Sequence, residues 1–288
     1  MNFLELREKY PEFSYNWYKI EENENEYKIT YEFEIKGLSK FNPTWTIPKM
    51  DKSKNNIPNK ELLENMVFNL GMVELVSYWK ITCAPHVTVK NIYLSQKQID
   101  WWKKLYFYGL GEFFYKNNIK TNIDEFMNIT AGTNKLLKSE INISDEFTGA
   151  LVPIGGGKDS IVTLNVIKDD FANNMCYVIN PRGATEETAE TAGYGENKRC
   201  YVKRTLDKNM LELNKQGYLN GHTPFSSIVA FSALIVAYLN KKKYIVLSNE
   251  ASANESTIYE EEVNHQYSKS YEFEQDFNEY VKENILDR

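Results

Sequence analysis

Three consecutive glycines stand between a short apolar run and an apolar helical pattern in the segment Leu151 to Leu164, LVPIGGGKDSIVTL. Glycine lets the backbone turn tightly and bring its N–H groups close to an oxyanion, and a helix N-terminus attracts negative charge. The segment therefore predicts a strand, a phosphate-binding loop and a helix. A Walker A loop is excluded because Lys158 is followed by Asp159, and no dinucleotide GxGxxG is present. The alternative interpretation is a glycine-rich turn with a capped helix that binds no ligand.

The side chains of this loop suit a nucleotide. Lys158 adds a positive charge and Ser160 a hydroxyl donor. Asp159 is predicted either to cap the helix or to bind Mg²⁺, which prefers oxygen ligands.

From Ala150 onward the order strand, loop, helix repeats. Strands are expected at Leu151–Ile154, Cys176–Ile179 and Arg199–Val202, and a final buried strand at Tyr244–Leu247. Helices are expected at Ser160–Lys168 and Ala184–Ala192. A third helix is expected to end at Leu239, with Thr223 as its N-cap and Pro224 as its first residue. This pattern is typical of a parallel sheet covered by helices on both faces. Ligands then bind beyond the carboxyl ends of the strands, after Ile154, Ile179 and Leu247.

The first half has a different pattern. Strand-forming residues at Tyr27–Ile35 and Trp45–Pro48 predict a small antiparallel sheet, and apolar residues at helical spacing predict core-facing helices over Lys60–Lys80 and Gln98–Tyr115. A polar segment follows, and the domain boundary is placed within it near residue 145. The predicted domains are residues 1–145 and 146–288.

Composition narrows the class of protein. Of 288 residues, 40 are Asp or Glu and 34 are Lys or Arg, and a net charge of −6 argues against a nucleic-acid partner. The three cysteines form no CxxC pair, so no zinc site is expected, and neither Cys176 nor Cys200 is predicted to be a nucleophile. The N-terminus lacks a signal-peptide pattern and Phe225–Leu239 is too short to span a bilayer, so a cytoplasmic protein without membrane contact is expected.

GGGKDS resembles the SGGxDS signature of the PP-loop ATP pyrophosphatases, with Gly155 in place of the first Ser. That superfamily cleaves ATP between the α- and β-phosphates and adenylates an acyl or carbonyl oxygen of its substrate. The resemblance implies a PP-loop ATPase-like doubly wound parallel sheet over residues 146–288, preceded by a smaller α+β domain. Loss of the Ser removes one hydroxyl from the pyrophosphate site and leaves the backbone donors.

Four segments in order carry a closer resemblance: PIGGGKDSIVT from Pro153, NGHTPFS from Asn220, LSNEASANE from Leu247 and EVNHQYSKSYEFE from Glu262. Together they are similar to the UDP-N-acetylmuramoyl-L-alanyl-L-glutamate epimerases of peptidoglycan precursor synthesis. The resemblance implies that UDP-MurNAc-L-Ala-L-Glu, ATP and water give the D-Glu product, AMP and pyrophosphate. Members of that family continue into a further region, so this chain resembles a C-terminally truncated member.

The resemblance also implies roles for single residues. The residues that would hold ATP are Gly155, Gly156, Gly157, Lys158, Asp159 and Ser160, and Asp159 would also bind Mg²⁺. The catalytic candidates are His222, His265 and Asp159. The substrate-binding candidates are Arg182, Thr223, Asn249, Glu250, Asn254, Tyr267 and Lys269. A histidine titrates near neutral pH and could transfer the α-proton. Structural roles, as packed histidines, turn caps or an exposed arginine, are the alternative interpretation for each.

Two other functions stay open. One is a different PP-loop enzyme, such as an amide-forming or tRNA-thiolating ATP pyrophosphatase, although thiolation would call for reactive cysteines and a basic surface. The other is a truncated domain that binds nucleotide without turnover. The sequence leaves the oligomeric state undetermined.

Overall fold

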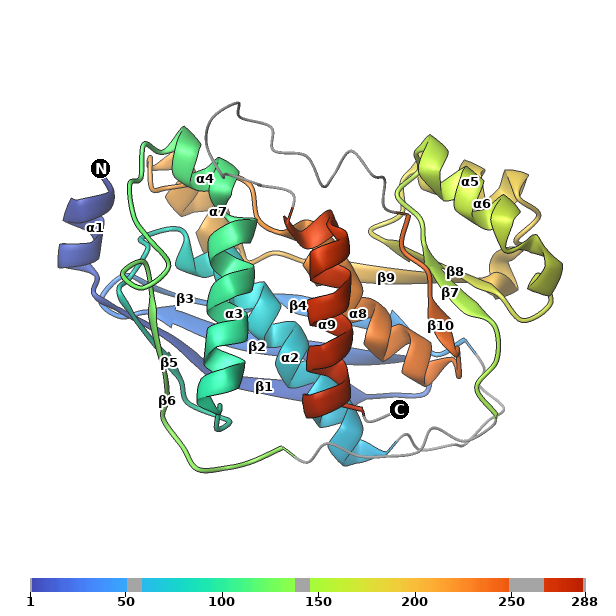
Figure 1. Cartoon of the computed structure of the whole chain (residues 1–288), viewed down its shortest axis with the longest axis horizontal. Helices are drawn as coiled ribbons and strands as arrows, with labels where there is room; N and C mark the ends of the chain where they lie inside the picture. Colours follow the sequence, from blue (N-terminus) through green and yellow to red (C-terminus); the bar gives the residue numbers. More distant parts are fainter. Residues whose placement is uncertain (1, 51–58, 138–145, 249–266, 287–288) are drawn as a thin grey trace.

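A single mixed sheet runs the length of the molecule, with most helices in front of it in the view of Figure 1. The computed structural model describes residues 2–50, 59–137, 146–248 and 267–286. In this part of the chain the strands follow the order β10-β7-β8-β9-β4-β2-β1-β5-β6, and β3 also pairs with β2. The residue placed at the domain boundary, 145, lies outside the described residues.

The second half forms the parallel end of this sheet. Its strands are β7 (Ala150–Pro153), β8 (Met175–Ile179), β9 (Arg199–Thr205) and β10 (Tyr244–Ile245), and β7 pairs in parallel with both β8 and β10. All four predicted strands are confirmed. The prediction that the last strand is buried is wrong for Tyr244, which is 55% exposed because β10 lies at the end of the sheet order.

Helices cover both faces of these parallel strands, as predicted. Val152 and Val178 pack with Leu164 of α5 (Lys158–Val166) and Ala189 of α6 (Gly183–Thr191). The alternate residues face the other side, where the Tyr177 hydroxyl donates to Ser232 Oγ of α8 (Phe225–Leu239) at 2.7 Å. Two apolar layers therefore enclose the strands that lead into the glycine loop. The short helices η1 (Lys168–Asp170), η2 (Glu196–Lys198) and α7 (Lys208–Lys215) connect these elements.

The first half contributes the rest of the sheet. After α1 (Phe3–Lys9), strands β1 (Glu12–Glu22), β2 (Glu26–Ile35), β3 (Ser39–Phe41) and β4 (Thr44–Pro48) are antiparallel, which confirms the predicted small sheet. Sequence reasoning missed β1, and it missed β5 (His86–Val89) and β6 (Asn128–Ala131), which extend the sheet in parallel beyond β1. Antiparallel pairing of β4 with β9, from Thr44–Thr205 to Thr46–Lys203, joins the two halves.

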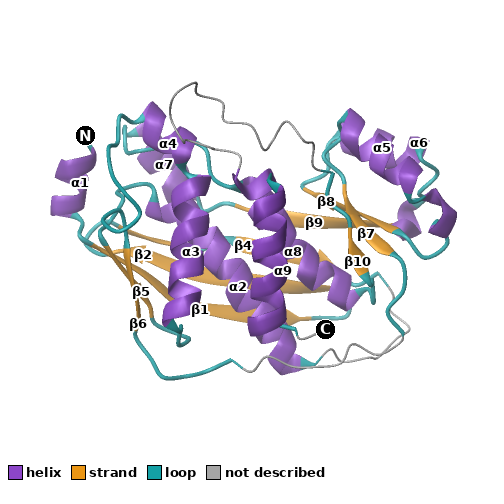
Figure 2. Cartoon of the chain, viewed as in Figure 1, coloured by secondary structure: helices purple, strands orange, loops and turns teal. Residues whose placement is uncertain are grey.

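Helices α2 (Lys60–Trp79), α8, α3 (Gln96–Gly109) and α9 (Tyr271–Asn284) form two layers on one side of the sheet (Figure 2). The predicted helix over 60–80 is α2, and it is buried on nearly every side because it packs against β1, β2 and α8. The outer layer contains α3 and α9, of which α9 was not predicted. Hydrogen bonds from Trp102 Nε1 to the Tyr280 hydroxyl (3.0 Å) and from that hydroxyl to Asn69 Oδ1 (2.7 Å) tie both helices to α2.

Two helix boundaries differ from the predictions. The helix expected over 98–115 is divided into α3 and α4 (Gly111–Lys116) at Leu110. A Cβ at Gly109 would lie 2.7 Å from Pro224 Cβ, so the α3 end admits the Pro224 ring only because residue 109 is glycine. The predicted cap of α8 is wrong: Pro224 is the N-cap, no side chain caps the helix, and the Thr223 carbonyl accepts the Phe225 N–H. Among the described helices, none has the length and apolar character to cross a membrane.

Candidate functional site

The glycine loop connects β7 to α5 at the carboxyl end of the sheet. Gly156 has a φ of +80°, in the left-handed region that favours glycine, and a Cβ there would lie 3.1 Å from Thr185 N of α6. Gly157 is the N-cap of α5 and provides no side-chain acceptor for the first N–H groups of the helix. The loop therefore has the compact backbone and the uncapped helix N-terminus that an anion site needs.

Ser160 fixes the shape of this loop. Its side chain is 5% exposed, and its Oγ accepts the Gly155 N–H at 3.1 Å. Lys158 is exposed and Asp159 is half-buried. Because Gly157 is the N-cap, Asp159 does not cap α5, and no described residue pairs with its carboxylate. The predicted capping role of Asp159 is therefore wrong, and its predicted role as a Mg²⁺ ligand stays a prediction.

The donor set of the loop is compatible with Mg²⁺ bound together with phosphates. In the described residues no three His, Cys, Asp or Glu side chains converge as a preformed metal cage. Magnesium sites at phosphates commonly use one or two carboxylates, with phosphate and water oxygens completing the octahedron. Asp159 beside an uncapped helix N-terminus fits that kind of site.

A second helix N-terminus lies beside the loop. Beyond β8, Arg182 is the exposed N-cap of α6, and its N–H donates to Thr185 Oγ1 at 2.9 Å. Asn180 has a φ of +49° and exchanges two 2.9 Å hydrogen bonds with the backbone of Arg204 in β9. The carboxyl ends of β7, β8 and β9 are thus held in one row, and sequence reasoning had not identified Asn180 as part of it.

The segment after β10 is described only at its start and end. Thr163 Oγ1 of α5 and Ser248 Oγ are hydrogen-bonded at 2.8 Å, so the end of β10 adjoins the helix that follows the glycine loop. The candidates Asn249, Glu250, Asn254 and His265 lie outside the described residues.

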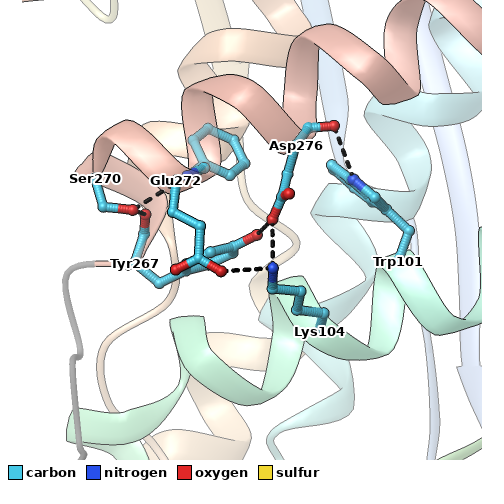
Figure 3. A network of polar contacts seen from close by, with 7 residues as sticks. Trp101, Lys104, Tyr267, Ser270, Glu272 and Asp276 are labelled. Carbon is cyan, nitrogen blue, oxygen red and sulfur yellow. Dashed lines mark hydrogen bonds and ion pairs between the residues drawn. The ribbon is translucent and has the colours of Figure 1, made fainter.

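Tyr267 lies in η4 (Tyr267–Lys269) and belongs to a polar network between α3 and α9 (Figure 3). It is 4% exposed, and its hydroxyl donates to Asp276 Oδ2. Lys104 binds the same Asp276 oxygen at 2.7 Å and Glu272 Oε1 at 2.6 Å. Burial, and then the Asp276 carboxylate, raise the pKa of the Tyr267 phenol, so it stays neutral. The structure places its hydroxyl inside this network, whereas Lys269 is exposed.

His222 and Thr223 lie in the loop before α8, against the first half of the chain. His222 Nδ1 is 3.8 Å from Glu112 Oε2 of α4. The buried Lys80, which follows α2, donates its Nζ to the Gly221 carbonyl. Burial and then the nearby Arg204 lower the pKa of Lys80 to about 8. Neither Glu112 nor Lys80 was a predicted site residue, because each is far from His222 in sequence.

A buried ion pair connects β9 to α2 close to the α8 N-terminus. Arg204 Nη2 and Nε contact Glu74 Oε1 and Oε2 at 2.6 and 3.0 Å, and Arg204 Cζ lies 6.0 Å from the ring centre of Phe225. Burial alone would lower the pKa of Arg204, but the Glu74 carboxylate outweighs burial and raises it. Glu74 was visible in the sequence as an acid within an apolar helix, but that pattern did not indicate its partner.

The described cysteines do not supply a nucleophile. Cys83, Cys176 and Cys200 are free and buried, and burial raises the pKa of both Cys176 and Cys200 to about 12. A thiol needs a lowered pKa to react readily near neutral pH. Burial and the raised pKa agree with the prediction that neither Cys176 nor Cys200 is a nucleophile.

Comparison with known proteins provides the family. The family model of the MurL N-terminal domain matches residues 5–288. Similar curated proteins are named UDP-N-acetyl-alpha-D-muramoyl-L-alanyl-L-glutamate epimerase in Xanthomonas oryzae pv. oryzae (29% identical over 75% of this chain and 47% of the relative), Salinispora tropica (28%, over 83% and 51%) and Micromonospora sp. (31%, over 71% and 45%). The chain thus spans about half the length of these relatives. No solved structure matches it. Because the family model covers almost the whole sequence, the chain belongs to the MurL N-terminal domain family.

Proposed function

We propose that this chain binds ATP and Mg²⁺ at the glycine loop and activates the terminal L-Glu of UDP-MurNAc-L-Ala-L-Glu for epimerisation to D-Glu. The observation that carries the proposal is the left-handed Gly156 packed against α6 beside the uncapped N-terminus of α5. The names of the relatives support this choice of substrate.

Chemistry explains why such a reaction uses ATP. The α-proton beside a carboxylate is very weakly acidic, because the carbanion would place a second negative charge next to the first. Attack of that carboxylate on the α-phosphorus forms an acyl-adenylate and releases pyrophosphate, after which the carbonyl can accept the electron pair as an enolate. Return of a proton to the opposite face and hydrolysis of the mixed anhydride by water then give D-Glu and AMP.

The residues of the loop have distinct tasks in this proposal. The N–H groups from Gly156 to Ser160 and the Lys158 ammonium bind the β- and γ-phosphates. The Asp159 carboxylate holds Mg²⁺, which neutralises charge on the departing pyrophosphate. Ser160 keeps the loop in shape through its bond to the Gly155 N–H.

His222 is the described candidate for moving the α-proton. Its Nδ1 lies 3.8 Å from Glu112 Oε2, so in this proposal the Glu112 carboxylate helps to orient the imidazole ring. His265 remains the other candidate for the opposite face. In this proposal Arg182, the N-cap of α6, contacts a phosphate or a carboxylate of the substrate.

The test is an incubation of the protein with ATP, Mg²⁺ and UDP-MurNAc-L-Ala-L-Glu, followed by measurement of AMP, pyrophosphate and the configuration of the released glutamate. Asp159→Ala should abolish AMP release, since the metal loses its carboxylate. Asp169→Ala, which removes an exposed carboxylate of η1, should retain the full rate. Full activity of Asp159→Ala would disprove the site assignment, and AMP without D-Glu would indicate another PP-loop substrate.

Nucleotide binding without turnover is the second candidate, favoured by the fact that the chain spans about half of its relatives. In that case calorimetry would detect ATP–Mg²⁺ binding that Asp159→Ala weakens, while no AMP would form. Absence of ATP binding to the folded protein would remove both candidates.

A further inference from the structure

Strand β10 has one edge that no described strand covers. It is the terminal strand in the sheet order, and the Tyr244 and Val246 N–H groups donate to Gly149 O (3.1 Å) and Leu151 O (3.0 Å) on the β7 side. Successive backbone groups along a strand alternate in direction, so the N–H groups of Ile245 and Leu247 point away from β7. This edge offers hydrogen-bonding groups to another strand.

Apolar side chains border the same edge. Val162 and Val166 of α5 are 61% and 75% exposed. Thr163 is bonded to Ser248, three residues beyond the end of β10, and marks the flank of α5 that faces this part of the chain. Successive residues of an α-helix are rotated by about 100° about its axis. Val166 is therefore about 60° and Val162 about 100° around the α5 axis from Thr163, both in the same direction. The two valines therefore continue the α5 surface outward past β10.

Tyr244 completes this surface. Its neighbour Ile245 packs into the core on the α8 side, so Tyr244 points to the α5 side, where it is 55% exposed. We call Val162, Val166, Tyr244 and the outward N–H groups of Ile245 and Leu247 the β10 edge surface. It combines an open strand edge with an apolar flank.

Edge strands in native proteins are usually protected by charges, proline, bulges or a covering element. The run Tyr244-Ile245-Val246-Leu247 contains no charge and no proline, and three lysines, Lys241 to Lys243, precede it. This short apolar run leaves backbone groups at the edge that can pair with another strand. Its apolar character therefore indicates a partner that is itself a polypeptide able to add a strand.

The relatives provide the candidate for that partner. The matched region covers 45–51% of their length, so about half of each relative lies outside it. We propose that the second half of the family's longer polypeptide adds a strand to β10 and packs apolar side chains over Val162 and Val166. This interaction concerns the side of α5 away from α6 and does not depend on the proposed chemistry at the glycine loop.

The experiment combines this chain with the half of the Xanthomonas oryzae relative that lies outside the matched region. Light scattering after size-exclusion chromatography should show a 1:1 complex, and amide hydrogen exchange should slow at Ile245 and Leu247. Val162→Asp/Val166→Asp should weaken binding at least tenfold, because two charges would be buried in the contact. Leu4→Asp/Leu211→Asp, at exposed apolar positions on α1 and α7, should bind as the wild type does.

Thermal unfolding of each variant checks that the fold is retained. If the double valine substitution lowers stability, the second variant is Tyr244→Lys, which puts a charge on the exposed side of the edge strand. Failure of the wild-type chain to form the complex would overturn the proposal. So would binding that is unchanged in both edge variants. A self-association abolished by these variants would assign the edge to a second copy of this chain and would also overturn it. ATP binding, measured in parallel, reports on the proposed function separately.

Discussion

Gly156 is the residue at which the backbone of the glycine loop depends most on the lack of a side chain. It combines a φ of +80° with a close approach to the α6 backbone, whereas a Cβ at Gly155 would have no heavy atom within 4 Å. We expect Gly156→Ala to lower the free energy of unfolding by about 1–3 kcal/mol and to weaken ATP binding, because the residue must leave the left-handed region or strain against Thr185. Gly155→Ala is the matched control for the fold and should leave the free energy of unfolding unchanged. Calorimetry and urea unfolding check both, and equal effects of the two substitutions would contradict the argument.

Lys80 gives a pH dependence whose sign follows from its environment. Burial and then Arg204 lower its pKa from 10.5 to about 8, so between these values the unfolded chain binds more protons than the folded one. Its destabilising contribution is present below about pH 8 and is relieved as the pH rises towards the unfolded value. Relative to Lys80→Met, the wild type should gain about 2 kcal/mol between about pH 7.5 and about pH 10. Urea unfolding at several pH values measures the difference, and a constant difference would show that Lys80 does not titrate this way.

Among the elements, α2 and β9 are held together by the Glu74–Arg204 pair. The Glu74 side chain is fully buried and that of Arg204 is 11% exposed, and Glu74 also accepts from Trp45 Nε1 at 3.3 Å. Glu74→Ala should lower the free energy of unfolding by about 3–5 kcal/mol, because it leaves a buried guanidinium without its carboxylate. Glu74→Met/Arg204→Met should regain most of that loss, since neither charge then remains.

Glu21→Ala is the control for this pair, because it breaks the exposed Lys19–Glu21 pair and should have no measurable effect. Urea unfolding with constant m-values checks the series. A double variant as unstable as Glu74→Ala would mean that packing of these side chains, and not the unpaired charge, determines the loss.

Elements with a strong local pattern could be predicted from the sequence, and those defined by distant partners could not. The strands β7 and β8 are continuous apolar runs next to turn residues, so local pattern sufficed. Strand β1 alternates only in part, with a register shift between Tyr15 and Trp17, which obscured it. Helix α9 did carry a helical stripe of Phe273, Phe277 and Tyr280, and that signal was overlooked.

In the candidate site, too, features encoded by a short segment could be predicted and contacts between distant residues could not. The glycine loop could be predicted because its chemistry lies within one short segment, and the structure adds that Gly156 contacts α6. The neighbours of His222 and Arg204 could not, because Glu112 and Glu74 come from helices more than 100 residues earlier in the chain. No local spacing encodes such contacts. The roles of the site residues remain predictions.

For the whole molecule, the β4–β9 pairing and the packing of α2 on α8 connect the two predicted domains. We expect residues 1–145 and 146–288 to unfold in one transition. All five Trp residues lie in the first half, and Trp101 and Trp102 also contact α9 of the second half. Their fluorescence therefore reports on the first half and its contact with α9, and amide exchange of β7 and β8 in urea reports on the glycine-loop strands of the second half. Coincident midpoints are expected. Separate midpoints would show that the halves are independently stable domains.

The junction between β4 and β9 also has a consequence for synthesis on the ribosome. Thr44 pairs with Thr205, 161 residues later in the chain, so β4 has no partner on that side until residue 205 has emerged. At about 5–20 residues per second this takes about 10–30 s. During that time the sheet of β1, β2 and β4 has an open edge at β4, which contains Trp45 and Ile47. The nascent first half therefore stays soluble only if aggregation is slow or a chaperone covers this edge until β9 has been synthesised.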